Sequence, residues 1–161
     1  MKFAASLDKI AVVLTVLVTV LFVAIVGGQY AFITDAGRAD PIYTTVGYLA
    51  IYGLAFAFRP AGYVVTNEEV LVSRPLLNVH IKRADIHRVV ALPAQDLSAS
   101  IRLFGVGGLF GYYGRYTNLR LGRTTWYATR RDTPVLVETT DNKKYILTPD
   151  DPSGFVRALA A

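Results

Sequence analysis

The stretch that decides the interpretation of this chain is RLFGVGGLFGYYGRYTNLRLGRTTWYATRR, residues 102–131. It holds six arginines and no acidic residue, and Phe, Tyr and Trp side chains are interspersed among glycines. Four of the glycines recur at every third position, at 105, 108, 111 and 114. Positive charge, amphipathic rings and a backbone that can turn tightly indicate a surface that faces an anionic partner or a partly apolar one.

The glycines suggest a phosphate-binding loop, but the residues after them do not fit one. A P-loop needs Lys followed by Ser or Thr after its last glycine, and then a helix. Here Tyr112, Tyr113 and Arg115 occupy those places, and the aromatic residues favour a strand. We therefore expect a β-hairpin whose glycines permit turns, bulges or close packing.

Eight residues of this stretch are candidates for a lipid- or partner-binding surface. We expect about half of the aromatic side chains to pack in a core and the others to reach the membrane interface, where Tyr and Trp rings prefer to lie. The arginines are either ordinary solvated side chains or a source of attraction to anionic head groups, at about 1 kcal/mol each. The candidate surface consists of Phe110, Tyr112, Tyr113, Arg115, Arg120, Arg123, Arg130 and Arg131.

Upstream, two apolar segments predict a transmembrane helical hairpin within residues 1–59. Residues 10–26 are interrupted only by two threonines and would cover about 26 Å as a helix, close to a hydrocarbon core of about 30 Å. Residues 42–58 form a second such run, in which Gly47 and Gly53 are places where another helix could approach closely. We expect spans at about 10–27 and 42–58. The alternatives are a cleaved signal peptide for the first run and a buried helix of a soluble domain for the second.

The distribution of Lys and Arg predicts the orientation of this hairpin. Lys2 and Lys9 precede the first span and Arg59 follows the second, whereas the loop between them holds only Arg38, with two aspartates nearby. The positive-inside rule then places both termini in the cytoplasm of a multi-pass protein of the inner (plasma) membrane. From residue 59 onward, 14 Lys and Arg stand against 9 Asp and Glu, so the net charge of +5 resides in the part that would face the anionic cytoplasmic leaflet.

Residues 60–161 have the pattern of a small β domain. Apolar alternation and turn residues predict strands at 63–66, 70–74, 79–82, 88–92, around 102, and at 116–121, 125–129, 135–139 and 143–147. Asp150 or Asp151 as a cap and Pro152 as a first helical residue predict a helix at about 152–160. Many short strands and one final amphipathic helix indicate a mainly-β barrel or sandwich closed at one end by that helix.

Three runs in this half resemble the bacterial PH-like (pleckstrin-homology-like) domains that are often found behind membrane spans. They are GYVVTNEEVLVSRPLLNVHIKRADI, RLFGVGGLFGYYGRY, and YATR together with LTPDDPSGFVRALA. The resemblance implies a PH-like roll of about seven antiparallel strands in two sheets, capped by the C-terminal helix. In eukaryotic relatives, basic residues around the first hairpin bind phosphoinositides. Here that turn carries Glu68 and Glu69, so inositide recognition does not carry over.

The chain offers little chemistry for catalysis. It has no cysteine, and its two histidines, His80 and His87, have only Asp85 close to them in sequence, which is too few ligands for a metal. No serine has a nucleophile-elbow context, and nothing assembles an acid, a base and a nucleophile. We therefore expect no enzymatic activity, cofactor, metal or small-molecule substrate, and tethering to a bilayer argues against nucleic acid.

The expected function is to present a cytoplasmic PH-like domain at the membrane for a protein partner or for a homo-oligomer, because strand edges offer a route to pairing. The rival function is peripheral sensing of anionic lipids by the surface of residues 102–131. A weaker rival is an enzyme whose site lies at the membrane boundary.

Overall fold

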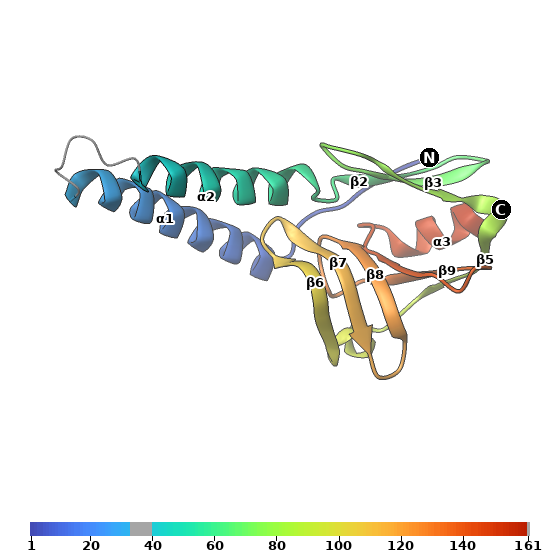
Figure 1. The fold of residues 1–161 in the computed structure, drawn as a ribbon. Helices are drawn as coiled ribbons and strands as arrows, with labels where there is room; N and C mark the ends of the chain where they lie inside the picture. Colours follow the sequence, from blue (N-terminus) through green and yellow to red (C-terminus); the bar gives the residue numbers. More distant parts are fainter. Residues whose placement is uncertain (33–39, 161) are drawn as a thin grey trace.

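The computed structural model describes residues 1–32 and 40–160. Two antiparallel helices, α1 (Lys9–Phe32) and α2 (Asp40–Ala57), project together from one end of a β domain (Figure 1). Within these ranges, α1 is the one helix that is long and apolar enough to cross a membrane, and α2 is a shorter apolar helix. Arg38, which the orientation argument uses, lies outside the described residues.

The two helices meet through side chains rather than through glycines. The hydroxyls of Thr19 and Tyr52 are hydrogen-bonded at 2.7 Å, and the ring of Phe22 packs against those of Tyr48 and Tyr52 at centroid distances of 5.3 and 5.7 Å. A side chain added at Gly47 or Gly53 would meet nothing within 4 Å. The close approach expected at these two glycines therefore does not involve α1.

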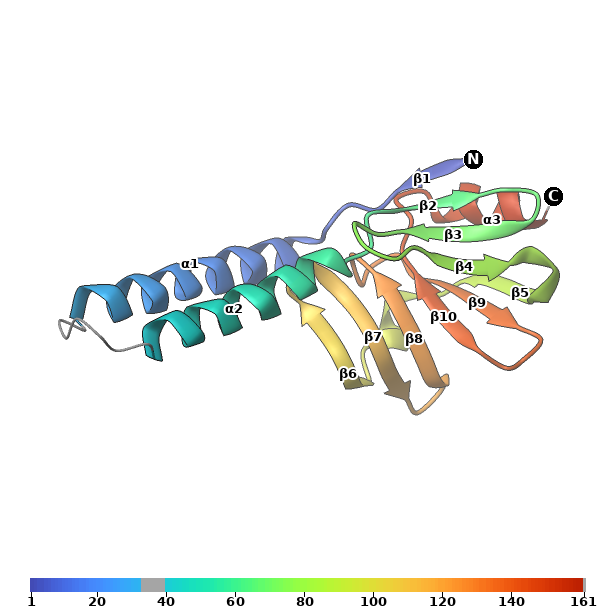
Figure 2. The same ribbon diagram turned by 45° about the horizontal axis from the view of Figure 1, so that its top comes forward.

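The β domain consists of two open sheets (Figure 2). The first is antiparallel, in the order β1 (Lys2–Ala4), β2 (Gly62–Val65), β3 (Glu69–Ser73) and β4 (Val79–Lys82). The second has the order β5 (Ile86–Ala91), β9 (Val135–Thr139), β10 (Lys144–Leu147), β8 (Gly122–Ala128), β7 (Gly111–Asn118) and β6 (Ser100–Gly108). Short 3-10 turns, η1 (Arg83–Asp85) and η2 (Ala94–Leu97), flank β5.

The strand count of about seven that the family resemblance implies is wrong, and so is the barrel that was expected as one of two alternatives. The described residues contain ten strands rather than seven, and the second sheet ends at free edges on β5 and β6 instead of closing. One pair, β10 with β8, is parallel, with Tyr145 opposite Thr125. Each of the nine strands predicted from the residue pattern has a counterpart in β2 to β10, and the tenth strand is β1, which the first residues of the chain form.

Strand β1 attaches the segment before α1 to the β domain. Lys2 pairs with Val64, and the amide of Val65 donates to the Met1 carbonyl at 2.8 Å. Farther on, the Ser6 hydroxyl and amide both donate to the Asp150 carboxylate, at 2.6 and 2.9 Å. The two helices are therefore inserted between the first and second strands of the sheet, so both of their domain-proximal ends are held by the same β domain.

The C-terminal helix α3 (Pro152–Ala160) forms where it was predicted and lies between the two sheets. Asp151 caps it by accepting a hydrogen bond from the Gly154 amide at 2.9 Å. Phe155 is fully buried, and its ring contacts Phe3 and Tyr63 edge-on at 5.2 and 5.9 Å. A second core surrounds Trp126, which stacks on Tyr116 at 4.1 Å. These two cores fix the position of the second sheet.

Candidate functional site

The glycine-rich stretch forms the β6–β7 hairpin, as the sequence predicts. Gly105, Gly108, Gly111 and Gly114 all have φ between +110° and +127°, in the region where a side chain is strained. Gly105 and Gly114 face each other across the strands, and a Cβ at either position would overlap the opposite backbone. The register shifts between Arg102 and Phe104, which is a β-bulge. The glycines therefore allow a tightly kinked hairpin, and a strand rather than a helix follows them.

The tip of this hairpin, residues 108–111, packs between α1 and α2. The Phe110 amide donates to the Thr15 hydroxyl oxygen at 2.9 Å, and a Cβ at Gly108 would overlap the side chain of Leu14. On the α2 side, the Phe110 ring contacts Tyr52 and Phe56 edge-on at centroid distances of 5.1 and 5.4 Å. The position of the β domain relative to the two helices is therefore held by these contacts as well as by the covalent connections.

The three aromatic members of the candidate surface are not surface residues. Phe110, Tyr112 and Tyr113 are 8%, 5% and 7% exposed. The Tyr113 hydroxyl donates to the Ala55 carbonyl of α2, and burial raises the pKa of Tyr113 well above its usual value. We expected about half of the aromatic rings in this stretch to pack in a core; all three of these are buried, because the hairpin packs against helices that the sequence pattern does not place there.

Three of the five candidate arginines are engaged within the protein. Arg120 forms an ion pair with Asp96, and Arg130 pairs with Asp132 at 2.8 Å and with Asp150 at 3.2 Å. Arg131 donates to the Leu97 carbonyl at 3.0 Å, and its guanidinium lies 5.7 Å from the ring centroids of Tyr112 and Trp126. The charges of Arg120 and Arg130 are therefore offset by carboxylates, whereas Arg131 is held in place but forms no ion pair in the described part of the chain.

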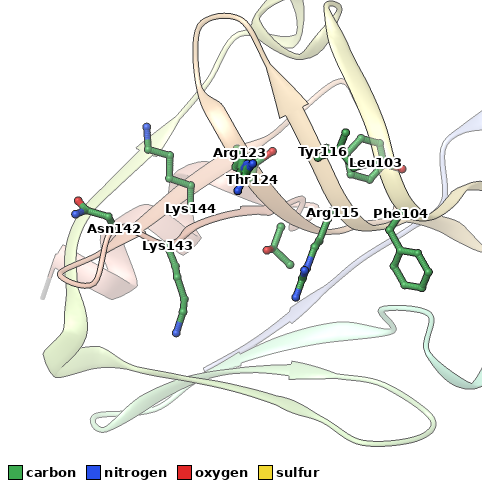
Figure 3. Close-up of a pocket in the computed structure, with 10 residues that line it drawn as sticks. Leu103, Phe104, Arg115, Tyr116, Arg123, Thr124, Asn142, Lys143 and Lys144 are labelled. Carbon is green, nitrogen blue, oxygen red and sulfur yellow. The ribbon is translucent and has the colours of Figure 1, made fainter.

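The other two, Arg115 and Arg123, line a cavity of about 410 Å³ that we call the basic groove. Figure 3 shows Phe104, Arg115 and Lys143 extending to the same side of the sheet. Lys143 is paired with Asp141 at 2.7 Å, and Lys144 with Glu138 at 3.4 Å. Within the part of the chain that the structure describes, Arg115 and Arg123 have no acidic partner. The groove is lined by Phe104, Arg115, Arg123, Thr125, Lys143 and Lys144, among others.

Phe104, Lys143 and Lys144 are groove residues outside the candidate surface predicted from the sequence. Phe104 is 76% exposed, although it lies in a strand opposite Arg115. Strand alternation around Arg115 and Thr125 could have placed Phe104 near the arginine, but only the parallel pairing of β10 with β8 brings the lysines there. That pairing joins segments that are not neighbours in sequence, and no local pattern signals it.

The histidines lie in surface pairs. His80 Nδ1 is 2.9 Å from Glu69 Oε2, and His87 Nε2 is 4.0 Å from Glu138 Oε2, where Arg88 and Lys144 also converge. Within residues 1–32 and 40–160 no group of three His, Cys, Asp or Glu side chains is arranged to hold a metal ion. The geometry on which a proposal can rest is therefore the docked hairpin and the basic groove.

Two sheets with a helix packed between them, and a glycine-kinked hairpin in the second sheet, define a PH-like β domain. The family model described as "Bacterial PH domain" matches residues 61–161, so the chain belongs to the bacterial PH domain family. No curated protein and no solved structure matches the chain. Strand β1 and both N-terminal helices lie outside the matched range, although the structure makes them part of the same unit.

Proposed function

We propose that this is a non-catalytic protein of the plasma membrane, anchored by two spans, that presents its PH domain at the cytoplasmic face to bind a protein partner or a second copy. The observation that carries the proposal is the hairpin tip locked between α1 and α2. A domain held in this way has one orientation relative to the helices, so the same face of the second sheet is always offered beside the membrane.

The surfaces of the helices support membrane insertion. The apolar window of α1 has a mean hydropathy of 3.0 and is only 6% buried. Val16, Leu17, Val20 and Leu21 of α1 are all more than half exposed, and so are Ile42, Val46, Leu49 and Ile51 of α2. The threonines in α1 are satisfied internally, since Thr15 donates to Ala11 and Thr19 is bonded to Tyr52. Such continuous apolar surface is suited to lipid and not to water.

The length of α2 is compatible with a second span. Its 18 residues extend about 27 Å at about 1.5 Å per residue, close to a hydrocarbon core of about 30 Å. Lys9 at the start of α1 and Arg59 after α2 lie at the end of the hairpin that carries the β domain (Figure 1). The positive-inside rule then assigns that end to the cytoplasm.

The free edge of β6 and the basic groove beside it are the proposed binding face. Ile101, Leu103 and Phe104 are 67%, 57% and 76% exposed along an edge strand of nine residues. A strand added to this edge would gain main-chain hydrogen bonds, and acidic side chains on it could reach Arg115 and Arg123. The partner chemistry that fits is therefore an extended segment with both apolar and acidic residues.

Lipid sensing by the eight-residue surface predicted from the sequence is not proposed. Three of its members are buried, and Arg120 and Arg130 are paired with aspartates. Arg131 lies away from the basic groove with a hydrogen bond to the Leu97 carbonyl, so only Arg115 and Arg123 remain together on one open face. Two exposed arginines beside an apolar strand edge suit a protein segment better than a bilayer, because the edge offers unpaired main-chain groups that lipids do not need.

Site-specific photocrosslinking in the native membrane tests the proposal. A photoreactive phenylalanine at position 104 of the full-length chain should form a protein adduct, and a differently tagged second copy shows whether the partner is the same chain. Arg115→Glu with Arg123→Glu should reduce the adduct several-fold, whereas Arg157→Glu on α3 should leave it unchanged. A crosslinker at Leu119, which is 95% exposed on the β7–β8 turn, is the positional control. An adduct yield that is the same in the wild type and in the charge-reversal variant would overturn the proposal.

A further inference from the structure

A second set of cations lies on the opposite face of the β6–β7 hairpin, next to α1. Arg102 and Arg131 line a cavity of about 240 Å³ together with Ser100, Tyr112 and Tyr116. Arg102 pairs with Tyr116 across the hairpin, and Tyr116 follows Arg115 in β7, so Arg102 and Arg115 point to opposite faces of the sheet. Tyr116 borders both this cavity and the basic groove. We call this cavity the junction pocket.

The junction pocket lies at the level of the second turn of α1. Its wall includes Gly107, where an added Cβ would be only 2.7 Å from Arg102 Nη1, so the guanidinium lies against the backbone there. The next residue, Gly108, packs on Leu14 of α1. Leu14 is about 7.5 Å along the helix from Lys9 at about 1.5 Å per residue. If α1 spans the bilayer, this level is the boundary between the head groups and the hydrocarbon.

Of the two cations of the pocket, Arg102 has no counter-charge among the described residues, whereas Arg131 lines a neighbouring cavity with Asp8 and Asp132. Across the described ranges Arg102 takes part in no ion pair or hydrogen bond, and Arg131 makes its one hydrogen bond to the Leu97 carbonyl. Asp8 caps α1 through the Ala11 amide at 2.7 Å and lies 3.3 Å from the Tyr112 hydroxyl; both donors are neutral, so its carboxylate keeps its charge and offsets part of that of Arg131. A guanidinium group at the cytoplasmic boundary of a membrane is attracted to anionic head groups by about 1 kcal/mol.

We propose that the junction pocket binds the head-group phosphate of an anionic phospholipid of the cytoplasmic leaflet. Arg102 and Arg131 donate to the phosphate oxygens, and the Ser100 hydroxyl faces the polar remainder of the head group. The cavity has room for about eight water molecules, enough for a phosphate diester. The inference rests on the proposed insertion of α1. It assigns lipid to this pocket and leaves the protein partner to the basic groove on the other face.

Native mass spectrometry of the full-length protein in detergent tests this assignment. Phosphatidylglycerol or phosphatidylcholine is added at matched concentrations, and the protein–lipid adducts are counted. One phosphatidylglycerol should be retained by the wild type in preference to phosphatidylcholine. Arg102→Gln should weaken retention about fivefold, as expected for one basic group at a membrane surface, and Arg123→Gln should not. Arg131→Lys is a second variant that keeps a positive charge in the pocket, and it should retain more lipid than Arg131→Gln.

Equal retention by the wild type and Arg102→Gln, or equal retention of both lipids, would overturn the assignment. An adduct with inorganic phosphate in lipid-free micelles that disappears in Arg102→Gln would show a free-anion site and would also overturn it. Extraction of membranes with alkaline carbonate distinguishes a failure of the proposed membrane insertion from a failure of the junction pocket alone. Release of the protein would contradict the membrane insertion itself, whereas retention without lipid selectivity would contradict only the junction pocket.

Discussion

Replacing Thr15 by valine should release the hairpin tip from α1. The Thr15 hydroxyl accepts the Phe110 amide at 2.9 Å and donates to the Ala11 carbonyl at 2.7 Å. Valine has nearly the same shape and is more apolar, so insertion of α1 is unimpaired, but the Phe110 amide loses its acceptor. Leaving a buried N–H without a partner costs about 1–3 kcal/mol. At about 1.36 kcal/mol per factor of ten, this corresponds to about 5- to 150-fold more frequent opening of the tip.

Hydrogen–deuterium exchange of the full-length protein in lipid nanodiscs measures this opening. The peptide that contains the Phe110 amide should exchange about 5- to 150-fold faster in Thr15→Val. Thr15→Ser, which keeps the hydroxyl, should stay close to the wild type, and a peptide over β9, whose residues are all buried, should not change in either variant. If Thr15→Val and Thr15→Ser exchange at the same rate, the hydroxyl does not hold the tip and the docking argument fails.

Three further predictions concern the β domain. Phe3→Ala removes a ring packed on the core and should lower the free energy of unfolding in urea by about 2–4 kcal/mol, whereas Lys2→Ala, exposed on the same strand, should change it by less than about 0.5 kcal/mol. Gly114→Ala should lower the melting temperature clearly, because its Cβ would overlap the Phe104 carbonyl at a φ of +127°, and Gly122→Ala, with open space around it, should lower it less. Burial raises the pKa of Tyr63 from 10.0 to about 12. The unfolded chain therefore loses the Tyr63 proton at lower pH than the folded chain does. The free energy of unfolding should then fall as the pH rises from about 10 to about 12. When the free energy of unfolding is measured at both ends of that window, it should depend less on pH in Tyr63→Phe than in the wild type.

Local patterns predicted the elements that depend on nearby residues. The apolar runs became α1 and α2, and Pro152 with Asp151 marked the start of α3, because composition and capping act over a few residues. Strand β1 was missed because a three-residue segment carries no period of its own and becomes a strand only by pairing with β2, some 60 residues later. The parallel pairing of β10 with β8 is non-local for the same reason.

The candidate site was predicted in composition but not in arrangement. The arginines of residues 102–131 were identified by their charge, yet Asp96, Asp132 and Asp150, which engage two of them, come from segments outside that stretch. Phe110 and Tyr113 were interpreted as partly interfacial, and the structure buries them against α1 and α2. Sequence alone could not show that the glycine-rich hairpin is the contact between the helices and the domain.

The central claim, that two spans hold this PH domain at the cytoplasmic face, is tested most directly by cysteine labelling in intact cells. The chain has no native cysteine, so single substitutions are read without background. A cysteine at Arg38, between the helices, should react with an impermeant maleimide added outside. A cysteine at Asn142, in the exposed turn between β9 and β10, should react only after the cells are opened. Labelling of both positions, or of neither, in intact cells would contradict the two-span arrangement.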